Sequence, residues 1–258
     1  MSAILFHIEE QVAFITLNRP EKLNAFNREM ALLLQQKLDE AASLTEVRCI
    51  YLTGSGKGFS AGQDLEEVVD PNGPGMAKIL AEHYNPIIRK IRNLPKPVVA
   101  AVNGVAAGAG ANIALACDIV VAHEKASFIQ AFSKIGLIPD SGGTYHLPRL
   151  IGWQRASALM MLGDKVAARE AQQMGMIYRV LDEPLFETES KQLAQTLATM
   201  PTHALGLIKH ALNKSFAQSL EDQLLLEDQF QQQAANTHDF QEGVQAFLEK
   251  RKPNFKGN

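Results

Sequence analysis

Short apolar runs open the chain. Residues 4–8 and 12–17 are rich in residues that favour β-strands, and three polar residues separate the two runs. This pattern predicts an antiparallel hairpin. Beyond residue 27 the apolar positions recur at helical spacing, and Asn27 is of a type that caps helix N-termini well. The apolar positions of this expected amphipathic helix are Met30, Leu33, Leu34, Leu38, Ala41 and Ala42.

Three further apolar runs predict buried strands, and helical patterns lie between them. The apolar runs cover residues 49–52, 98–102 and 118–122. One helical pattern covers residues 76–93, and small residues from 105 to 111 lead into a second, apolar helix that runs through residue 116. Strand, helix and strand therefore alternate, which is typical of a parallel α/β layer. The sequence shows no internal repeat at a fixed period.

The second half of the chain is mostly helical. Four consecutive segments rich in Gln, Leu and Ala predict helices at residues 184–200, 202–215, 219–235 and 239–250. We therefore expect two regions in this protein. Residues 1–183 would form an α/β core, and residues 184–258 a helical C-terminal region.

The composition narrows the class of protein. With 258 residues, 46% of them hydrophobic and 21% charged, the chain can bury a large core without metal or disulfide, which excludes disorder as its main state. A formal net charge of −3 gives no general attraction for nucleic acid or anionic lipid. Cys49 and Cys117 each lie inside an apolar run, which favours two buried thiols over a disulfide framework or a cysteine zinc site.

Targeting signals are not visible in the sequence. The first residues lack the basic start, the apolar core and the small-residue cleavage site of a signal peptide. Uninterrupted apolar stretches are shorter than the roughly 18 residues that a membrane span requires. We therefore expect a cytoplasmic protein without membrane or nucleic-acid partners.

Two motifs fail when their spacing is checked. Residues 54–58 read Gly-Ser-Gly-Lys-Gly, but the phosphate loop of nucleotide-binding proteins needs Ser or Thr directly after Gly-Lys, where this chain has Gly58. His123-Glu124 begins like the helix of a zinc protease, but Ser127 occupies the position of the second histidine ligand. Neither triphosphate binding nor zinc proteolysis is therefore expected.

Asp140, Ser141 and the two glycines that follow resemble the nucleophile segment of trypsin-like proteases. That fold is all-β, whereas this chain is α/β and helical, so a protease of this kind is not expected. A structural alternative exists for both side chains. Because a helix could begin at Gly142, Asp140 or Ser141 could serve as its N-cap.

Two glycine-containing turns remain as candidates for chemistry. Gly62-Gln63 follows the expected strand at residues 49–52, and Gly108-Ala109-Gly110 follows the strand at residues 98–102. Two such turns on neighbouring strands could aim two backbone N–H groups at one oxygen and so form an oxyanion hole. The alternative is that the glycines only allow tight contact between helix and strand.

An ordered series of segments resembles the crotonase superfamily, also called the enoyl-CoA hydratase/isomerase family, over essentially the whole chain. The segments are residues 17–20, 22–25, 59–65, 95–98, 101–104, 117–118, 136–144, 147–149 and 242–251. This resemblance implies an α/β fold, a spiral of ββα units with a helical C-terminal trimerisation region. It also implies thioester chemistry on an acyl-CoA, with the backbone N–H groups of Gln63 and Ala109 as the oxyanion hole.

The resemblance further implies which acid/base groups are present. Hydratases of the family use two glutamates, and the matching positions here hold Asn112 and Phe132. Asp140 matches the aspartate of isomerases that act on unsaturated acyl-CoAs, so we expect it to be the single acid/base carboxylate. Phe132 would dry the pocket and raise the pKa of Asp140 above about 3.9. A closer resemblance is to the branch that rearranges a ring epoxide of a phenylacetyl thioester and can also shift enoyl double bonds. It is carried by residues 85–89, 105–111, 131–140 and 206–209.

Coenzyme A is then part of the substrate, and no separate cofactor is expected. By resemblance, the residues expected to contact the substrate are Lys22, Ala61, Gly62, Asp64, Leu65, Gly108, Asn112, Phe132, Lys252 and Phe255. Among them, Lys252 and Phe255 would reach the CoA of a neighbouring subunit, because the family forms trimers that often pair into hexamers. Three alternatives stay open: an enoyl-CoA hydratase, a ring-opening hydrolase, and a non-catalytic acyl-CoA-binding or scaffold protein.

Overall fold

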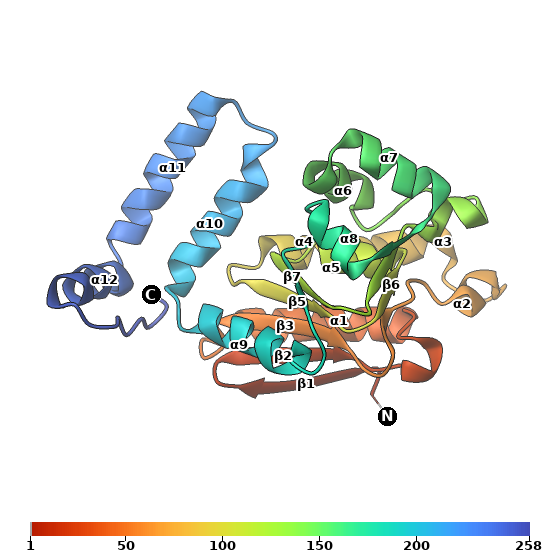
Figure 1. Cartoon of the computed structure of the whole chain (residues 1–258), viewed down its shortest axis with the longest axis horizontal. Helices are drawn as coiled ribbons and strands as arrows, with labels where there is room; N and C mark the ends of the chain where they lie inside the picture. The colour runs from red at the N-terminus through yellow and green to blue at the C-terminus, as the bar shows by residue number, and fades with distance from the viewer. Residues whose placement is uncertain (1) are drawn as a thin grey trace.

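Two β-sheets form the core of the computed structural model, which describes residues 2–258 (Figure 1). The larger sheet has the strand order β1-β2-β3-β5-β7-β10, with β1 and β2 antiparallel and the other pairs parallel. Its strands are β1 (Ile4–Glu9), β2 (Val12–Leu17), β3 (Cys49–Gly54), β5 (Val98–Val102), β7 (Ile119–His123) and β10 (Arg179–Leu181). The expected hairpin and the three expected core strands are confirmed.

A smaller sheet adds the strands on which the two glycine turns begin. It has the order β4-β6-β8-β9, formed by β4 (Gly58–Ser60), β6 (Val105–Ala107), β8 (Ser127–Ile129) and β9 (Lys165–Ala167). A strand of the larger sheet is followed by one of the smaller sheet three times, as β3-β4, β5-β6 and β7-β8. The chain therefore spirals through repeated two-strand units, as the expected fold class requires, although the repeat is invisible in the sequence.

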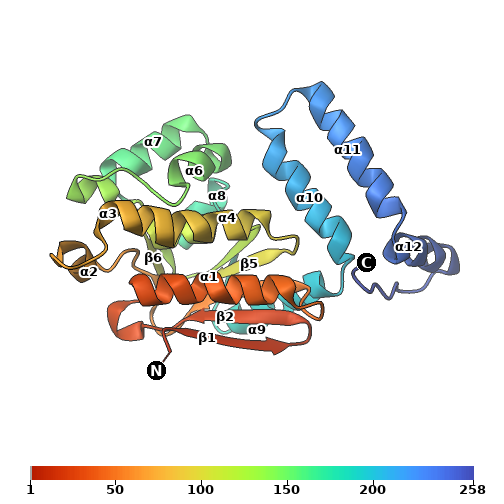
Figure 2. The same cartoon turned by 180° about the vertical axis from the view of Figure 1, so that it is seen from behind.

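Helices cover both faces of the larger sheet. α1 (Arg28–Ser43) and α4 (Asn85–Asn93) lie over one face, in the foreground of Figure 2, and their apolar residues share a core with the sheet. α9 (Phe186–Ala198) packs on the opposite face. The expected N-cap of α1 is confirmed, because the side chain of Asn27 accepts the N–H of Met30 at 3.0 Å.

One predicted helix is interrupted. In place of a regular helix over residues 76–93, the structure has α3 (Gly75–Lys78), a π-helical segment (Ile79–Tyr84) and then α4. Pro86 has no N–H to donate to the Glu82 carbonyl, which instead accepts a 2.7 Å hydrogen bond from Nε2 of Gln35. The proline therefore explains why the wider turn ends where α4 begins.

The remaining helices complete the layers. They are α2 (Leu65–Val69), α5 (Ala109–Leu115), α6 (Gly143–Ile151), α7 (Trp153–Leu162), α8 (Ala168–Gln173), α10 (Thr202–Ser215), α11 (Leu220–Ala235) and α12 (His238–Glu249), with 3₁₀ turns at Pro20–Lys22 and Ala131–Ile135. The four predicted C-terminal helices are thus confirmed. Among the helices of residues 2–258, none has the length and apolar character that crossing a bilayer requires.

The C-terminal helices extend away from the two sheets. In Figure 1, α10 to α12 project to one side, whereas α9 lies against the larger sheet. α10 is tied to the core by the buried Lys209, whose Nζ lies 2.8 Å from a carboxylate oxygen of Asp118.

The division of the chain into residues 1–183 and 184–258 stays a prediction. Met1, the first residue of the predicted core region, lies outside the described residues. Both cysteines are buried with free thiols, as expected.

Candidate active site

The two glycine turns and Asp140 line one cavity of about 470 Å³. Its wall is mostly apolar. The lining residues are Ala61, Gly62, Gln63, Leu65, Val68, Val69, Met76, Ile79, Tyr84, Gly108, Ala109, Ala131, Phe132, Ile135, Leu137 and Asp140. Eight of the sequence-predicted site residues are therefore brought together from distant parts of the chain, namely Ala61, Gly62, Gln63, Leu65, Gly108, Ala109, Phe132 and Asp140.

The two turns touch each other at Gly62. Its φ is +89°, in the region that favours glycine. A Cβ added there would lie 2.9 Å from the carbonyl oxygen of Ala107 and 3.3 Å from the amide nitrogen of Ala109. Glycine at this position thus satisfies a backbone conformation and a close approach at once. It brings the Gln63 turn against the start of α5.

Both candidate N–H donors are left without a protein acceptor. The backbone N–H of Phe26 donates to the Gly62 carbonyl at 2.6 Å, and the Phe26 carbonyl accepts the Asp64 N–H at 2.8 Å. These bonds pair Phe26 with the residues on either side of Gln63, so the Gln63 N–H points away from Phe26. Ala109 is the first residue of α5, where N–H groups have no acceptor inside the helix. Within residues 2–258 neither N–H has a hydrogen-bond partner. Two donors are therefore free at adjoining turns.

Asp140 supplies the carboxylate of the cavity wall. Burial raises its pKa above the usual value, while a 2.8 Å hydrogen bond from the Ser141 hydroxyl opposes that rise. The N-cap interpretation of Asp140 and Ser141 is wrong. α6 begins at Gly143 with Gly142 as its cap, and no side chain makes the capping bond. The carboxylate of Asp140 is therefore not committed to capping this helix.

The two positions that the family resemblance matched to hydratase glutamates, residues 112 and 132, hold side chains without acid/base function. Phe132 is buried in the cavity wall, and its ring would lie 3.6 Å from a Cβ at Gly108. Asn112 is only 1% exposed and lies outside the cavity lining. Its Nδ2 donates to the Asp140 carbonyl at 2.9 Å, and its Oδ1 accepts from Gln130 at 2.7 Å. Asn112 therefore holds the backbone of Asp140.

Four other predicted contacts lie outside the cavity lining. Lys22 is partly exposed and pairs with Glu66 at 2.6 Å. Asp64 caps α2 and pairs with Arg19 at 3.0 Å. Lys252 is exposed on the C-terminal tail. Phe255, from the same tail, lines a separate groove.

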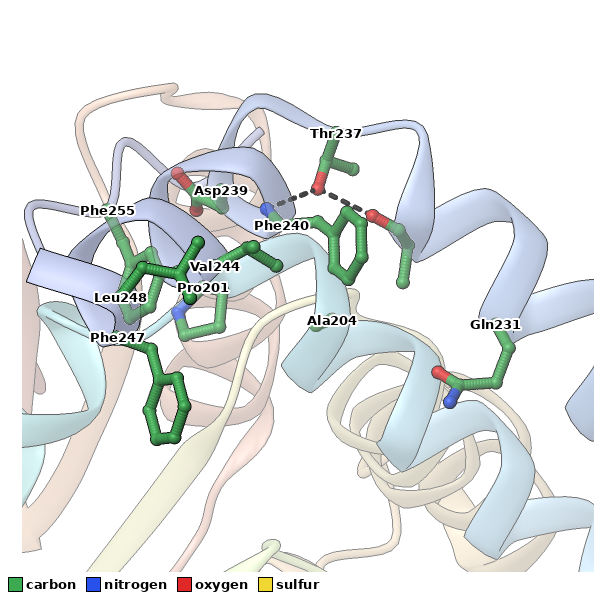
Figure 3. A pocket seen from close by; sticks show the side chains of 12 residues that line it. Pro201, Ala204, Gln231, Thr237, Asp239, Phe240, Val244, Phe247, Leu248 and Phe255 are labelled. Atoms are coloured by element: carbon green, nitrogen blue, oxygen red, sulfur yellow. Dashed lines mark hydrogen bonds between the residues drawn. The ribbon is translucent and has the colours of Figure 1, made fainter.

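That groove lies between α10, α11 and α12 and has a volume of about 460 Å³ (Figure 3). Its wall is mostly apolar, with Val244, Phe247 and Leu248 on α12. The carboxylate of Asp239 accepts the N–H groups of Lys256 and Gly257 and so fastens the tail. The groove thus offers apolar surface and no free acid/base pair.

Several cavity residues carry no sequence motif. Val68, Val69, Met76 and Ile79 fit an ordinary amphipathic pattern, so nothing in the sequence separates them from core positions. Leu137 lies inside a segment that carries the family resemblance, and its position could have been included. Tyr84 is buried, and its hydroxyl donates to Oε1 of Gln63 at 2.7 Å. Sequence analysis gave no reason to select it.

Comparisons with known proteins agree with this geometry. Residues 7–258 match the family described as enoyl-CoA hydratase/isomerase. The chain is 49% identical to the 1,2-epoxyphenylacetyl-CoA isomerase of Escherichia coli K12, over 100% of this chain and 99% of that protein. It is 44% identical to an enoyl-CoA hydratase of Rhodobacter capsulatus, over 98% of each. A solved enoyl-CoA hydratase/isomerase structure from Mycobacterium abscessus superimposes with a TM-score of 0.93 at 37% identity, over 99% of this chain and 100% of that one.

Proposed function

The chain belongs to the enoyl-CoA hydratase/isomerase family, and from this premise we propose that it isomerises acyl-CoA thioesters with Asp140 as its single acid/base carboxylate. One observation carries the proposal. Within the described residues 2–258, Asp140 is the one carboxylate among the residues that line the cavity, and the same cavity contains both glycine turns. One carboxylate beside an oxyanion hole matches proton transfer between two carbons of the same substrate.

The proposed reaction begins with the thioester oxygen bound by the N–H groups of Gln63 and Ala109. Asp140 removes a proton from a carbon next to the unsaturated system, and the electron pair moves onto the thioester oxygen as an enolate forms. The protonated Asp140 then returns the proton to another carbon, so the double bond moves and the composition is unchanged. An oxyanion donor contributes about 10²–10³ in rate, and a general base about 10²–10⁴.

Water addition is the competing reaction, because the R. capsulatus relative is named as an enoyl-CoA hydratase. A hydratase must activate a water molecule and also protonate the neighbouring carbon. Phe132 is apolar, and both polar ends of the Asn112 amide already have protein partners. The cavity therefore supports isomerisation better than hydration. A non-catalytic acyl-CoA-binding role would give no function to the carboxylate of Asp140 in an otherwise mostly apolar cavity wall.

For the acyl group we propose a ring-bearing substrate. The E. coli relative is named for 1,2-epoxyphenylacetyl-CoA, and the apolar wall around Phe132 suits an aromatic ring. The proposed activities are rearrangement of this ring epoxide to the oxepin-CoA and migration of enoyl double bonds, as part of phenylacetate catabolism. CoA would be recognised from outside the cavity lining by Lys22, and by Lys252 and Phe255 of a neighbouring subunit.

A homotrimer, alone or paired into a hexamer, is the proposed assembly. α10 to α12 leave large apolar side chains uncovered in the single chain, and Phe247 on α12 is 83% exposed. Exposed apolar surface of this kind marks an association site. The mass of the protein in solution tests this part directly.

Turnover of a 3-enoyl-CoA to the conjugated 2-enoyl isomer tests the proposed function, with hydration of crotonyl-CoA measured in parallel. We expect isomerisation by the wild type and a loss of at least about 10²-fold in Asp140→Asn, with acyl-CoA binding retained. Conversion of the ring epoxide follows as the second substrate. Hydration that survives in Asp140→Asn would favour the hydratase, and binding without any turnover would favour the scaffold role.

A further inference from the structure

A fully buried tyrosine in the cavity wall has no part in the proposed reaction. Tyr84 ends the π-helical segment, is 0% exposed, and packs edge-on against Phe26 with ring centroids 6.0 Å apart. Its hydroxyl reaches the side chain of Gln63 at 2.7 Å. We infer that Tyr84 is a positioning residue that fixes the Gln63 peptide through this hydrogen bond. The inference rests on the proposed function, in which the Gln63 N–H binds the thioester oxygen.

The direction of the bonds follows from the partners of the Gln63 amide. A carboxylate of Glu67 lies 2.8 Å from one end of that amide, and an ionised carboxylate only accepts hydrogen bonds. The end facing Glu67 is therefore Nε2, which also donates to the Asp64 carbonyl at 3.3 Å. Oε1 consequently faces Tyr84, and the tyrosine hydroxyl must be the donor.

These bonds commit the side chain of Gln63 to the protein. Both hydrogens of Nε2 have acceptors and Oε1 has a donor. The amide therefore holds Gln63 in place and is not free to bind substrate. The other oxygen of Glu67 accepts the backbone N–H of Arg28 at 2.8 Å. A continuous chain of hydrogen bonds thus links Tyr84, through Gln63 and Glu67, to the start of α1.

The same bonds exclude an acid role for Tyr84. Its one hydroxyl proton is directed at Gln63, so it is not available to a substrate in this arrangement. Burial raises the pKa of Tyr84 well above its usual value, and the nearby Asp140 adds to that rise. The phenol therefore stays protonated and remains a donor throughout the neutral pH range.

The turn that carries Gln63 needs such support. Gly62 has no side chain to pack, and its positive φ places the turn in contact with Ala107 and Ala109. Phe26 fixes the backbone on one side of Gln63. The side-chain bonds to Tyr84 and Glu67 fix the residue from another direction. Oxyanion donors act only when held within about 0.5 Å of the productive position, so loss of one tie should appear in kcat.

Tyr84→Phe tests the inference, because it deletes the hydroxyl and keeps the ring. We expect kcat for 3-enoyl-CoA isomerisation to fall about 10- to 100-fold with KM nearly unchanged, as for other supporting contacts to a reactive group. Tyr51→Phe is the matched control, since Tyr51 is also buried and its hydroxyl makes one 2.8 Å bond to Ser190, away from the cavity. The control should lose comparable stability and keep wild-type kcat. Equal kcat in both variants would overturn the inference.

Two further measurements separate positioning from general damage. A push–pull aromatic acyl-CoA absorbs at longer wavelength when its carbonyl is polarised, and we expect wild type and Tyr51→Phe to shift it more than Tyr84→Phe does. In a Gln63→Met background, Tyr84→Phe should have no further effect on kcat. Additive losses would contradict action through Gln63.

The spectroscopic experiment also distinguishes failure of the proposed oxyanion hole from failure of the positioning role of Tyr84. If the wild type binds the acyl-CoA but leaves its spectrum unshifted, the proposed oxyanion hole fails and this inference fails with it. If the wild type shifts the spectrum and Tyr84→Phe shifts it equally, the oxyanion hole stands and only the role of Tyr84 is refuted.

Discussion

Gly62→Ala should damage catalysis more than stability alone explains. The added methyl would lie 2.9 Å from the Ala107 carbonyl oxygen and 3.3 Å from the Ala109 nitrogen. Because the first distance is too short for a real contact, the backbone between the two turns must move. The Ala109 N–H would then leave its place beside the Gln63 N–H. Loss of one oxyanion donor lowers kcat about 10²–10³-fold, and we expect a fall of this size.

The stability cost has two parts that can be separated. Placing Ala at φ +89° costs about 1–2 kcal/mol in backbone strain. Forcing a methyl against packed backbone typically adds about 1–3 kcal/mol. The expected loss in the free energy of unfolding is therefore about 2–5 kcal/mol. Urea unfolding of the variant measures it.

Gly152→Ala is the matched control. Gly152 has φ +80°, but nothing lies within 4 Å of an added Cβ. At φ +80° and ψ +161° the alanine should cost only backbone strain, about 1–3 kcal/mol, and the variant should keep wild-type kcat. If folded Gly62→Ala loses no more stability than Gly152→Ala and turns over the 3-enoyl-CoA as fast as wild type, the reasoning about the two turns is refuted.

Three further predictions concern charged and polar groups. The kcat/KM should fall as pH drops through the raised pKa of Asp140, because the base must be ionised; Ser141→Ala should move this acid limb to higher pH, and an unchanged profile would contradict the role of the hydroxyl. Asp140→Asn should raise the thermal midpoint at pH 7, since burial penalises the ionised carboxylate, and the gain should shrink as pH is lowered through that pKa; a lower midpoint at pH 7 would argue against desolvation. Lys209→Ala should lower the free energy of unfolding by about 1–3 kcal/mol, because Asp118 loses its buried ammonium partner and keeps Arg92 at 3.2 Å, and a cost near zero in urea unfolding would refute this.

Local sequence determined the individual elements. The β1-β2 hairpin, the α1 N-cap at Asn27 and the C-terminal helices follow from patterns that neighbouring residues set by themselves. The same approach missed the π-helical segment, which depends on Pro86 and on a hydrogen bond to the Glu82 carbonyl from Gln35. Gln35 lies on α1, 47 residues before Glu82. The glycine pattern selected both turns and the family resemblance selected Asp140, and the structure places all three at one cavity.

Tertiary structure decided how those parts meet. No local pattern shows that Gly62 touches Ala107, because β4 and β6 become neighbours only when the spiral is complete. Tyr84 lies in no recognisable sequence motif. Its bond to Gln63 exists only because the π-helical segment packs over the Gly62-Gln63 turn. Capping by Asp140 was a fair expectation from sequence, yet α6 begins at Gly143 and leaves the carboxylate at the cavity. Sequence therefore determined which groups are present, and packing between distant segments determined which of them face one another, since contact energies depend on distance in space.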